Sequence, residues 1–210
     1  MTPRQCIIAG ALLSGAALYL TGTAQSAPPG PHDPDLPCQQ IKVPQLSLAA
    51  VWSGPSIDQQ QENWQQDQTV TELVRETAQR RTPIEQAQEK IQTFAAQVGT
   101  ARQMKLLDLF AGLFRTLDDE RSSVIAGLDR FGMRQKELAT DLRNDNEKLR
   151  MMQADPKSEA GDINQLTQKV TWEAQVFQDR RQALSYACDV PAKIEQRLFA
   201  LARTVQEALQ

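Results

Sequence analysis

The chain has few of the side chains that most enzyme active sites use. It contains one histidine, His32, and only 5% of its 210 residues are aromatic. Nucleophilic catalysis by serine or cysteine usually needs a histidine held inside the packed structure, whereas His32 stands among prolines. Paired carboxylates for glycoside hydrolysis normally need a cleft, and few aromatics are present to line one. We therefore predict that the protein is not an enzyme.

Motifs for cofactors and metal ions are also absent from the sequence. There is no Walker loop and no GxGxxG motif for a nucleotide. The acidic segment 155–162 lacks the alternating oxygen ligands and the glycine of a calcium-binding EF-hand loop. His32 and Asp33 lie close to Cys38, but a proline-rich leader does not hold ligands at fixed distances. We predict no cofactor and no metal site.

A surplus of positive charge is missing as well. The formal net charge is −3, and Arg4 is the one charged residue among the first 26. Domains that bind nucleic acid usually display a basic face. We therefore predict no nucleic-acid partner.

The longest uncharged apolar run stands at the N-terminus. Residues 7–20 carry no charge, Arg4 precedes them, and small residues follow. This layout is typical of a secretory signal peptide, whereas a membrane span needs about 18 or more apolar residues. We predict a signal peptide over residues 1–26, cleaved after Ala24 or Ser26, with an uncleaved anchor as the alternative. The remaining chain is expected to be periplasmic or secreted, with no integral membrane span.

Cysteine is scarce, and its positions indicate a disulfide. Cys6 lies in the signal segment, which leaves Cys38 and Cys188 at a separation of 150 positions. Exported proteins meet an oxidising environment, in which two thiols usually form a disulfide. A metal or redox pair is the alternative, but the chain has no CxxC motif. We predict a structural disulfide between Cys38 and Cys188.

Proline is concentrated near the N-terminus and is then missing from a long stretch. Five prolines fall within residues 28–37, and Pro44 interrupts the segment that follows. We therefore predict a proline-rich leader and an irregular packing segment over residues 27–55. Between Pro83 and Pro156 there is no proline for 72 residues, which permits a very long helix.

This proline-free stretch has the apolar spacing of a coiled-coil helix. Large apolar side chains recur at steps of three and four. We predict a helix over residues 100–153, a turn at 154–161 and a return helix over 162–187. The two helices are expected to form an antiparallel hairpin that projects over about 134–180. The seam of the first helix reads Leu106, Phe110, Leu113, Leu117, Arg121, Val124, Leu128, Phe131, Gln135, Leu138 and Leu142.

Shorter helices are predicted on both sides of the hairpin. They cover residues 69–80, residues 83–99 and the end of the chain from Pro191. Thr82 is predicted to cap the second of these helices through its side chain. Gly99 is predicted to end that helix in the left-handed conformation.

Together these elements predict an all-α protein. Residues 56–210 are expected to form a bundle of about four helices with a long antiparallel, coiled-coil-like hairpin. An N-terminal irregular segment is stapled to it by the disulfide. Glycines inside the long helix favour close helix crossings, and a bend near Gly132 is left open.

Polar residues interrupt the apolar stripes of the hairpin. Such residues either extend to solvent at the seam edge or set the register of the two helices. Counting back from the turn places Gln135 roughly opposite the Arg180/Arg181 region, and Glu173 roughly opposite Asn144 and Asp145. The polar residues at seam positions are Arg121, Gln135, Glu173 and Arg181.

Candidate contact residues for a protein partner lie on the hairpin. Trp172 is either packed in the core, as tryptophan usually is, or an exposed anchor for a partner. Met151, Met152 and Ser158 lie near the tip. We predict a non-enzymatic protein that acts as an adaptor, an assembly factor or a chaperone-like protein. The partner is not identified by the sequence, and a homo-oligomer is an open alternative.

The sequence also permits a second function, the binding of an apolar small molecule or lipid. Aromatic residues of the long helix favour a pocket between the helices for an apolar small molecule or lipid. The residues expected near this pocket are Phe110, Phe114 and Phe131.

Overall fold

The computed structural model describes residues 37–39 and 42–210. The predicted signal peptide over residues 1–26 and most of the predicted leader lie outside the described residues. The described part is built from α-helices and short 3-10 helices, without a strand, which confirms the all-α class. None of its helices is both long and apolar enough to cross a membrane.

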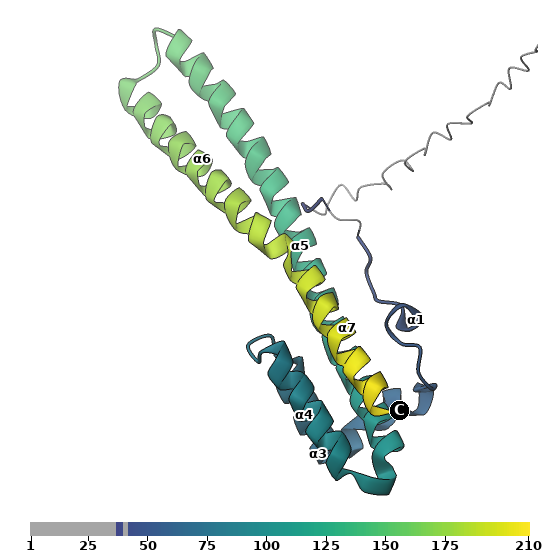
Figure 1. The fold of residues 1–210 in the computed structure, drawn as a ribbon. Coiled ribbons are helices and arrows are strands. Elements are labelled where there is room, and N and C mark those ends of the chain that lie inside the picture. Colours follow the sequence, from purple (N-terminus) through teal and green to yellow (C-terminus); the bar gives the residue numbers. More distant parts are fainter. Residues whose placement is uncertain (1–36, 40–41) are drawn as a thin grey trace, which may run out of the picture. The chain divides into compact units, whose positions relative to one another are not determined.

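Figure 1 shows how the helices follow one another along the chain. The long helix and the return helix begin and end within two residues of their predicted bounds. The elements are α1 (Leu48–Val51), α2 (Asp58–Asn63), η1 (Trp64–Gln66), α3 (Gln68–Ala78), α4 (Ile84–Gln97), η2 (Gly99–Ala101), α5 (Arg102–Ala154), α6 (Ala160–Cys188) and α7 (Val190–Ala208).

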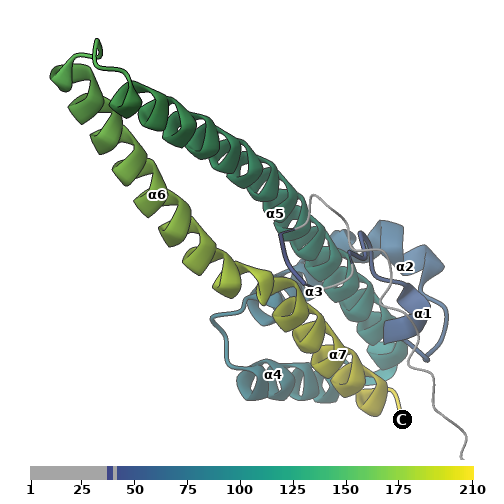
Figure 2. The same cartoon turned by 90° about the horizontal axis from the view of Figure 1, so that it is seen from above.

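The hydrophobic core lies around the first part of α5. There α5 packs against α2, α3 and α7, and α4 packs against α3 and α7 (Figure 2). Trp52 stacks on Phe110, with ring centroids 3.8 Å apart and planes inclined by 13°. The place beside Phe110 where a ligand pocket was expected is therefore filled by a side chain of the protein. Phe110 is fully buried together with Leu106, Leu109, Leu113 and Leu117.

A glycine permits a close contact within this core. A Cβ atom at Gly112 would lie 2.7 Å from the Trp64 ring and 2.7 Å from the Val74 side chain. The predicted close crossing is therefore confirmed at Gly112, where α5 meets η1 and α3. Helix α5 then continues without interruption through Gly132 to Ala154.

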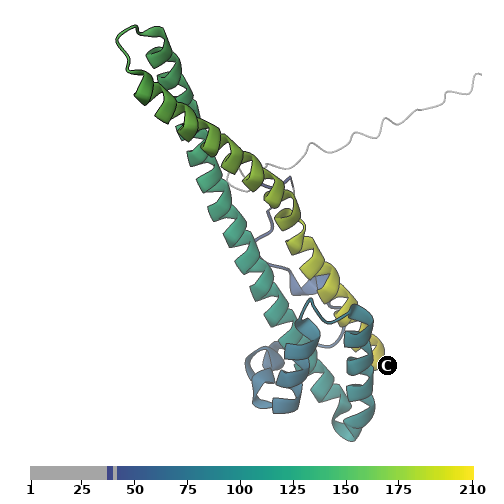
Figure 3. The ribbon, with the colours of Figure 1, turned by 90° about the vertical axis from the view of Figure 1, so that its left-hand side faces the viewer.

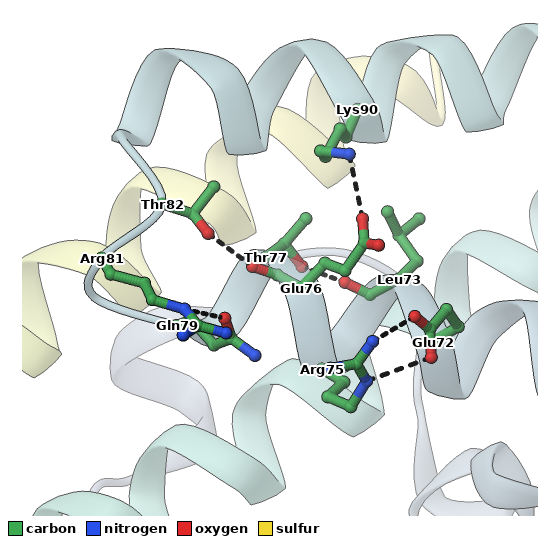
Figure 4. A network of polar contacts seen from close by, with 9 residues as sticks. All are labelled: Glu72, Leu73, Arg75, Glu76, Thr77, Gln79, Arg81, Thr82 and Lys90. Atoms are coloured by element: carbon green, nitrogen blue, oxygen red, sulfur yellow. Dashed lines mark hydrogen bonds and ion pairs between the residues drawn. The ribbon is translucent and has the colours of Figure 1, made fainter.

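The turn between α3 and α4 differs from its prediction in one detail. Pro83, and not Thr82, stands at the cap position of α4, and no side chain caps this helix. The Thr82 hydroxyl instead donates to the Glu76 carbonyl at 3.0 Å (Figure 4). The last carbonyls of α3 have no partner within the helix, so they attract this hydroxyl. At the far end of α4, Gly99 has a φ of 53°, which confirms the left-handed conformation.

The irregular N-terminal segment lies along α5. The predicted disulfide joins Cys38 to Cys188 with a Cα–Cα distance of 5.6 Å. Beyond it, Lys42 Nζ lies 2.8 Å from Asp129 Oδ2. The seam residue Arg121 is buried, donates to the Val43 carbonyl at 2.6 Å and pairs with Glu195. Arg121 therefore joins three segments of the chain, and does not extend to solvent.

The hairpin consists of α6 packed antiparallel on the second half of α5. Gln135 Nε2 donates to the Phe177 carbonyl at 3.0 Å, and Lys169 Nζ lies 2.6 Å from Asp145 Oδ2. Gln135 therefore lies about one helical turn from the expected Arg180/Arg181 region. Glu173 lies near Asp145 as expected, since Lys169 Nζ is within 3.6 Å of Glu173 and 2.6 Å of Asp145. Arg181 is exposed, so it does not face Gln135.

Candidate partner-binding surface on the hairpin

The predicted contact residues do not form a single cluster. Trp172 lies midway along α6 and is 69% exposed, so core packing is the wrong interpretation of this residue. Met151 is 62% exposed near the end of α5. Met152 is half-buried, and Ser158 lies in the turn with its backbone N–H donating to the Asp155 carbonyl at 3.0 Å. The tip residues and Trp172 are thus separate parts of one long hairpin.

Helix α6 has two stripes at helical spacing. The first faces α5 and contains Leu166, the sole buried residue of this helix. The second stripe stands one position earlier, which is about 100° around the helix. We call this second set the outer stripe. Its members are Asp162, Gln165, Lys169, Trp172, Val176, Asp179, Ala183 and Tyr186.

Tyr186 is the functional candidate that sequence reasoning missed. Its side chain is 71% exposed, and it lies 14 positions after Trp172, which is close to four helical turns. Both aromatic rings therefore lie on the same face of α6. The spacing from Trp172 was the signal in the sequence that would have identified Tyr186.

Two recesses open between α5 and α6 on one side of the hairpin. Lys148 and Asp162, which each precede a seam residue, help to line the recess near the tip. Gly127 and Ala183, which also precede seam residues, help to line the recess near the disulfide. In an antiparallel helix pair, the positions that stand one before a seam residue lie on the same side of the pair in both helices. Both recesses therefore lie on the side of the outer stripe.

The recess near the disulfide is small and apolar. Its volume is about 270 Å³. Of the three aromatic residues expected at a ligand pocket, Phe131 is the one that lines it. Its lining residues are Val124, Gly127, Leu128, Phe131, Ala183, Leu184 and Ala187.

We call the core built by α2, α3, α4 and α7 around the first part of α5 the base of the structure. In the base, the same side is covered by other helices. Glu120 and Arg197 also precede seam residues, of α5 and α7 respectively. Arg80 Nε lies 3.0 Å from Glu120 Oε1, and Arg197 donates to the Thr77 and Thr82 carbonyls. Figure 3 shows α3 and α4 beside the lower part of α5 but not beside the hairpin. Among residues 37–39 and 42–210, the hairpin therefore continues a helix-packing surface without a helix to cover it.

Charged groups along the hairpin are held by partners across the seam. The hydrogen bond that Lys169 donates to Asp145 raises the pKa of Lys169, and the charges of Asp145 and Glu173 act in the same direction. Gln135 Oε1 and Glu173 Oε2 are buried and have no hydrogen-bond partner. Buried polar atoms without hydrogen-bond partners lower stability. These two atoms therefore reduce the stability of the packing between α5 and α6.

Other polar groups of the described residues pair with one another in the groove between α3 and α4. In the groove between α3 and α4, Glu72 pairs with Arg75, and Glu76 lies 2.9 Å from Lys90 Nζ (Figure 4). The hydrogen bond from Arg75 lowers the pKa of the exposed Glu72 carboxyl. Within residues 37–39 and 42–210, no group of three or more acidic, histidine or cysteine side chains is arranged to hold a metal ion.

Comparison with family models, with curated proteins and with solved structures finds no match to this chain.

Proposed function

We propose that this chain is an exported, non-enzymatic protein that binds another protein through its hairpin. In this role it acts as an adaptor, an assembly factor or a chaperone-like protein. The exposed Trp172 on α6 carries the proposal, because large aromatic side chains are the commonest anchors of protein interfaces. The disulfide supports the export part of the proposal, since such bonds persist mainly outside the cytosol.

The surroundings of Trp172 also support a binding surface. Helix α6 buries one of its residues, whereas a helix in a complete bundle buries a whole stripe. An amphipathic helix from a partner would cover the outer stripe in the same way that α3 and α4 cover the base. Helix-in-groove binding is a common mode of peptide recognition.

Photocrosslinking in cells tests this proposal. A photoreactive residue is placed at Trp172 in one variant, at Ser158 in a second, and at the exposed Gln92 of α4 as a control. We expect one dominant protein adduct from position 172 or 158 and none from position 92. Equal, diffuse labelling from all three positions would contradict a specific hairpin interface.

A second candidate function is supported by the apolar recess beside Phe131. Its lining carries almost no polar surface, so it suits an apolar small molecule or a lipid chain. A Cβ at Gly127 would have one neighbour within 4 Å, Arg130 Nη2 at 3.9 Å. Gly127→Ile should therefore fill the recess without disturbing the helix. If the native protein binds a fluorescent fatty acid and this variant does not, the pocket function is favoured; equal binding by both argues against it.

A further inference from the structure

We propose that the outer stripe of α6 binds the same stripe of a second copy of this chain. The two α6 helices run antiparallel, and the two-fold axis passes level with Ala174. This inference rests on the proposed function, because it names the partner of the same surface. The chemistry of the residues that this alignment pairs supports it.

The spacing of the stripe is the same in both directions along the helix. Its eight positions follow steps of three, four, three, four, three, four and three. Because this series is symmetric, an antiparallel copy centred level with residue 174 brings every member opposite another member. The resulting pairs are 162 with 186, 165 with 183, 169 with 179, and 172 with 176.

The paired residues are chemically complementary. Trp172 meets Val176 of the second copy, so the largest exposed apolar group faces another apolar group. Lys169 meets Asp179 of the second copy, which joins opposite charges. Each pair occurs twice across a two-fold axis. The proposed interface therefore contains two apolar contacts and two ion pairs.

The outer ends of the stripe are complementary as well. The phenol of Tyr186 lies opposite the carboxylate of Asp162, and a phenol O–H is a good donor to a carboxylate. Gln165 lies opposite Ala183, where a small residue leaves room for the longer amide. No pair in this register brings like charges together.

The charged members are available although they already have partners. Lys169 Nζ lies 2.6 Å from Asp145 and 3.6 Å from Glu173, but its side chain remains 54% exposed and an ammonium group has three donors. Asp179 Oδ1 accepts from Gln175 Nε2 at 2.8 Å, and a carboxylate accepts several hydrogen bonds. An intermolecular ion pair adds to these contacts and does not need to replace them.

The size of the stripe sets the expected strength. It is about 36 Å long at 1.5 Å per residue, and a single helix face buries less than the roughly 800 Å² per partner of a standard interface. We therefore expect a reversible dimer with a dissociation constant in the micromolar range.

Charge exchange between two variants tests the pairing. The full chain is studied by sedimentation equilibrium as wild type, Lys169→Asp and Asp179→Lys, with Arg143→Asp as a control elsewhere on the hairpin. Each single variant should dimerise about tenfold or more weakly, because like charges then face each other. The control should dimerise like the wild type. An equal mixture of the two single variants should form heterodimers of wild-type strength, since every pair is again opposite in sign.

Rescue in the mixture separates the proposed pairing from a merely weakened hairpin. A hairpin damaged by loss of the Lys169–Asp145 contact would not be restored by a second damaged chain. A wild-type chain that stays monomeric, or single variants that dimerise normally, would overturn the inference. If the monomeric chain still yields one adduct from position 172, only the identity of the partner is overturned; if it yields none from 172 or 158, the proposed function falls too.

Discussion

At the scale of single residues, Arg197 shows how one buried cation can join several segments. It is nearly fully buried, and burial lowers the pKa of its guanidinium. Its nitrogen atoms donate to the Thr77 carbonyl at 2.6 and 2.9 Å and to the Thr82 carbonyl at 2.9 Å. Arg197 therefore connects α7 to the end of α3 and to the turn before α4.

Replacing Arg197 with methionine should destabilise the protein. The substitution keeps the apolar contacts but leaves buried carbonyls unpaired, at a cost of about 3 kcal/mol. Urea denaturation measures the change, with Arg203→Met on the exposed face of α7 as the control. A loss no larger than that of the control would show that water satisfies these carbonyls equally well.

Asp108 provides a prediction about pH. Burial raises the pKa of this carboxyl, although the neighbouring Lys105 acts in the opposite direction. A raised pKa in the folded state stabilises the protein below the unfolded pKa, and this contribution is lost as pH rises through the folded value. Asp108→Asn should therefore be more stable than the wild type near pH 7 and no more stable near pH 3.

Melting temperatures at several pH values measure this effect. The matched control is Asp141→Asn, at an exposed carboxylate on the same helix. A gain for Asp108→Asn that is equally large at low pH would rule out burial of the charge as its cause.

At the scale of elements, α5 contains glycines with opposite packing environments. Gly112 is enclosed by Trp64 and Val74, whereas Gly127 has open space where a side chain would stand. Alanine is favoured over glycine inside a helix by about 1 kcal/mol. Packing therefore decides whether the same substitution stabilises or destabilises the protein.

Gly127→Ala should raise the free energy of unfolding by about 1 kcal/mol. Gly112→Ala should lower it by about 1–3 kcal/mol, because the added methyl group overpacks the contact with η1 and α3. The two variants serve as controls for each other in thermal unfolding. Changes of the same sign would mean that helix propensity outweighs packing at Gly112.

Element boundaries were predictable because they depend on local chemistry. The long helix and the return helix follow from apolar spacing and the lack of proline. Thr82 was misassigned because the bonding of its hydroxyl depends on the end of α3, six residues away. The position opposite Gln135 was wrong by about one turn, since the Phe177 carbonyl, and not the Arg180/Arg181 region, accepts a hydrogen bond from its amide.

At the scale of the whole described chain, the disulfide is a covalent link between two distant segments. It closes a loop of 150 positions and fixes the segment around Cys38 to the end of α6. Cys188→Ser should lower stability by about 4–5 kcal/mol under oxidising conditions, mainly by freeing the unfolded chain. Thermal unfolding with and without reductant measures it: the difference from the wild type should vanish in reductant. An unchanged melting temperature without reductant would contradict this stabilising role.

The sequence by itself determined the helical class, the hairpin and the cysteine pair. Periodicity, proline spacing and the count of thiols are properties of neighbouring residues or of composition, so they can be read without a fold. The identity of the candidate contact residues was also within reach, since Trp172 and Tyr186 share one helical face.

Only the tertiary structure decided which faces are covered. Trp172 looked like a core residue because tryptophan usually is one, yet no other helix of the described part of the chain packs over the outer stripe. Arg121 looked like an edge residue, yet the N-terminal segment covers it. Burial depends on elements distant in the sequence, and for that reason the bare side of the hairpin became apparent only from the fold.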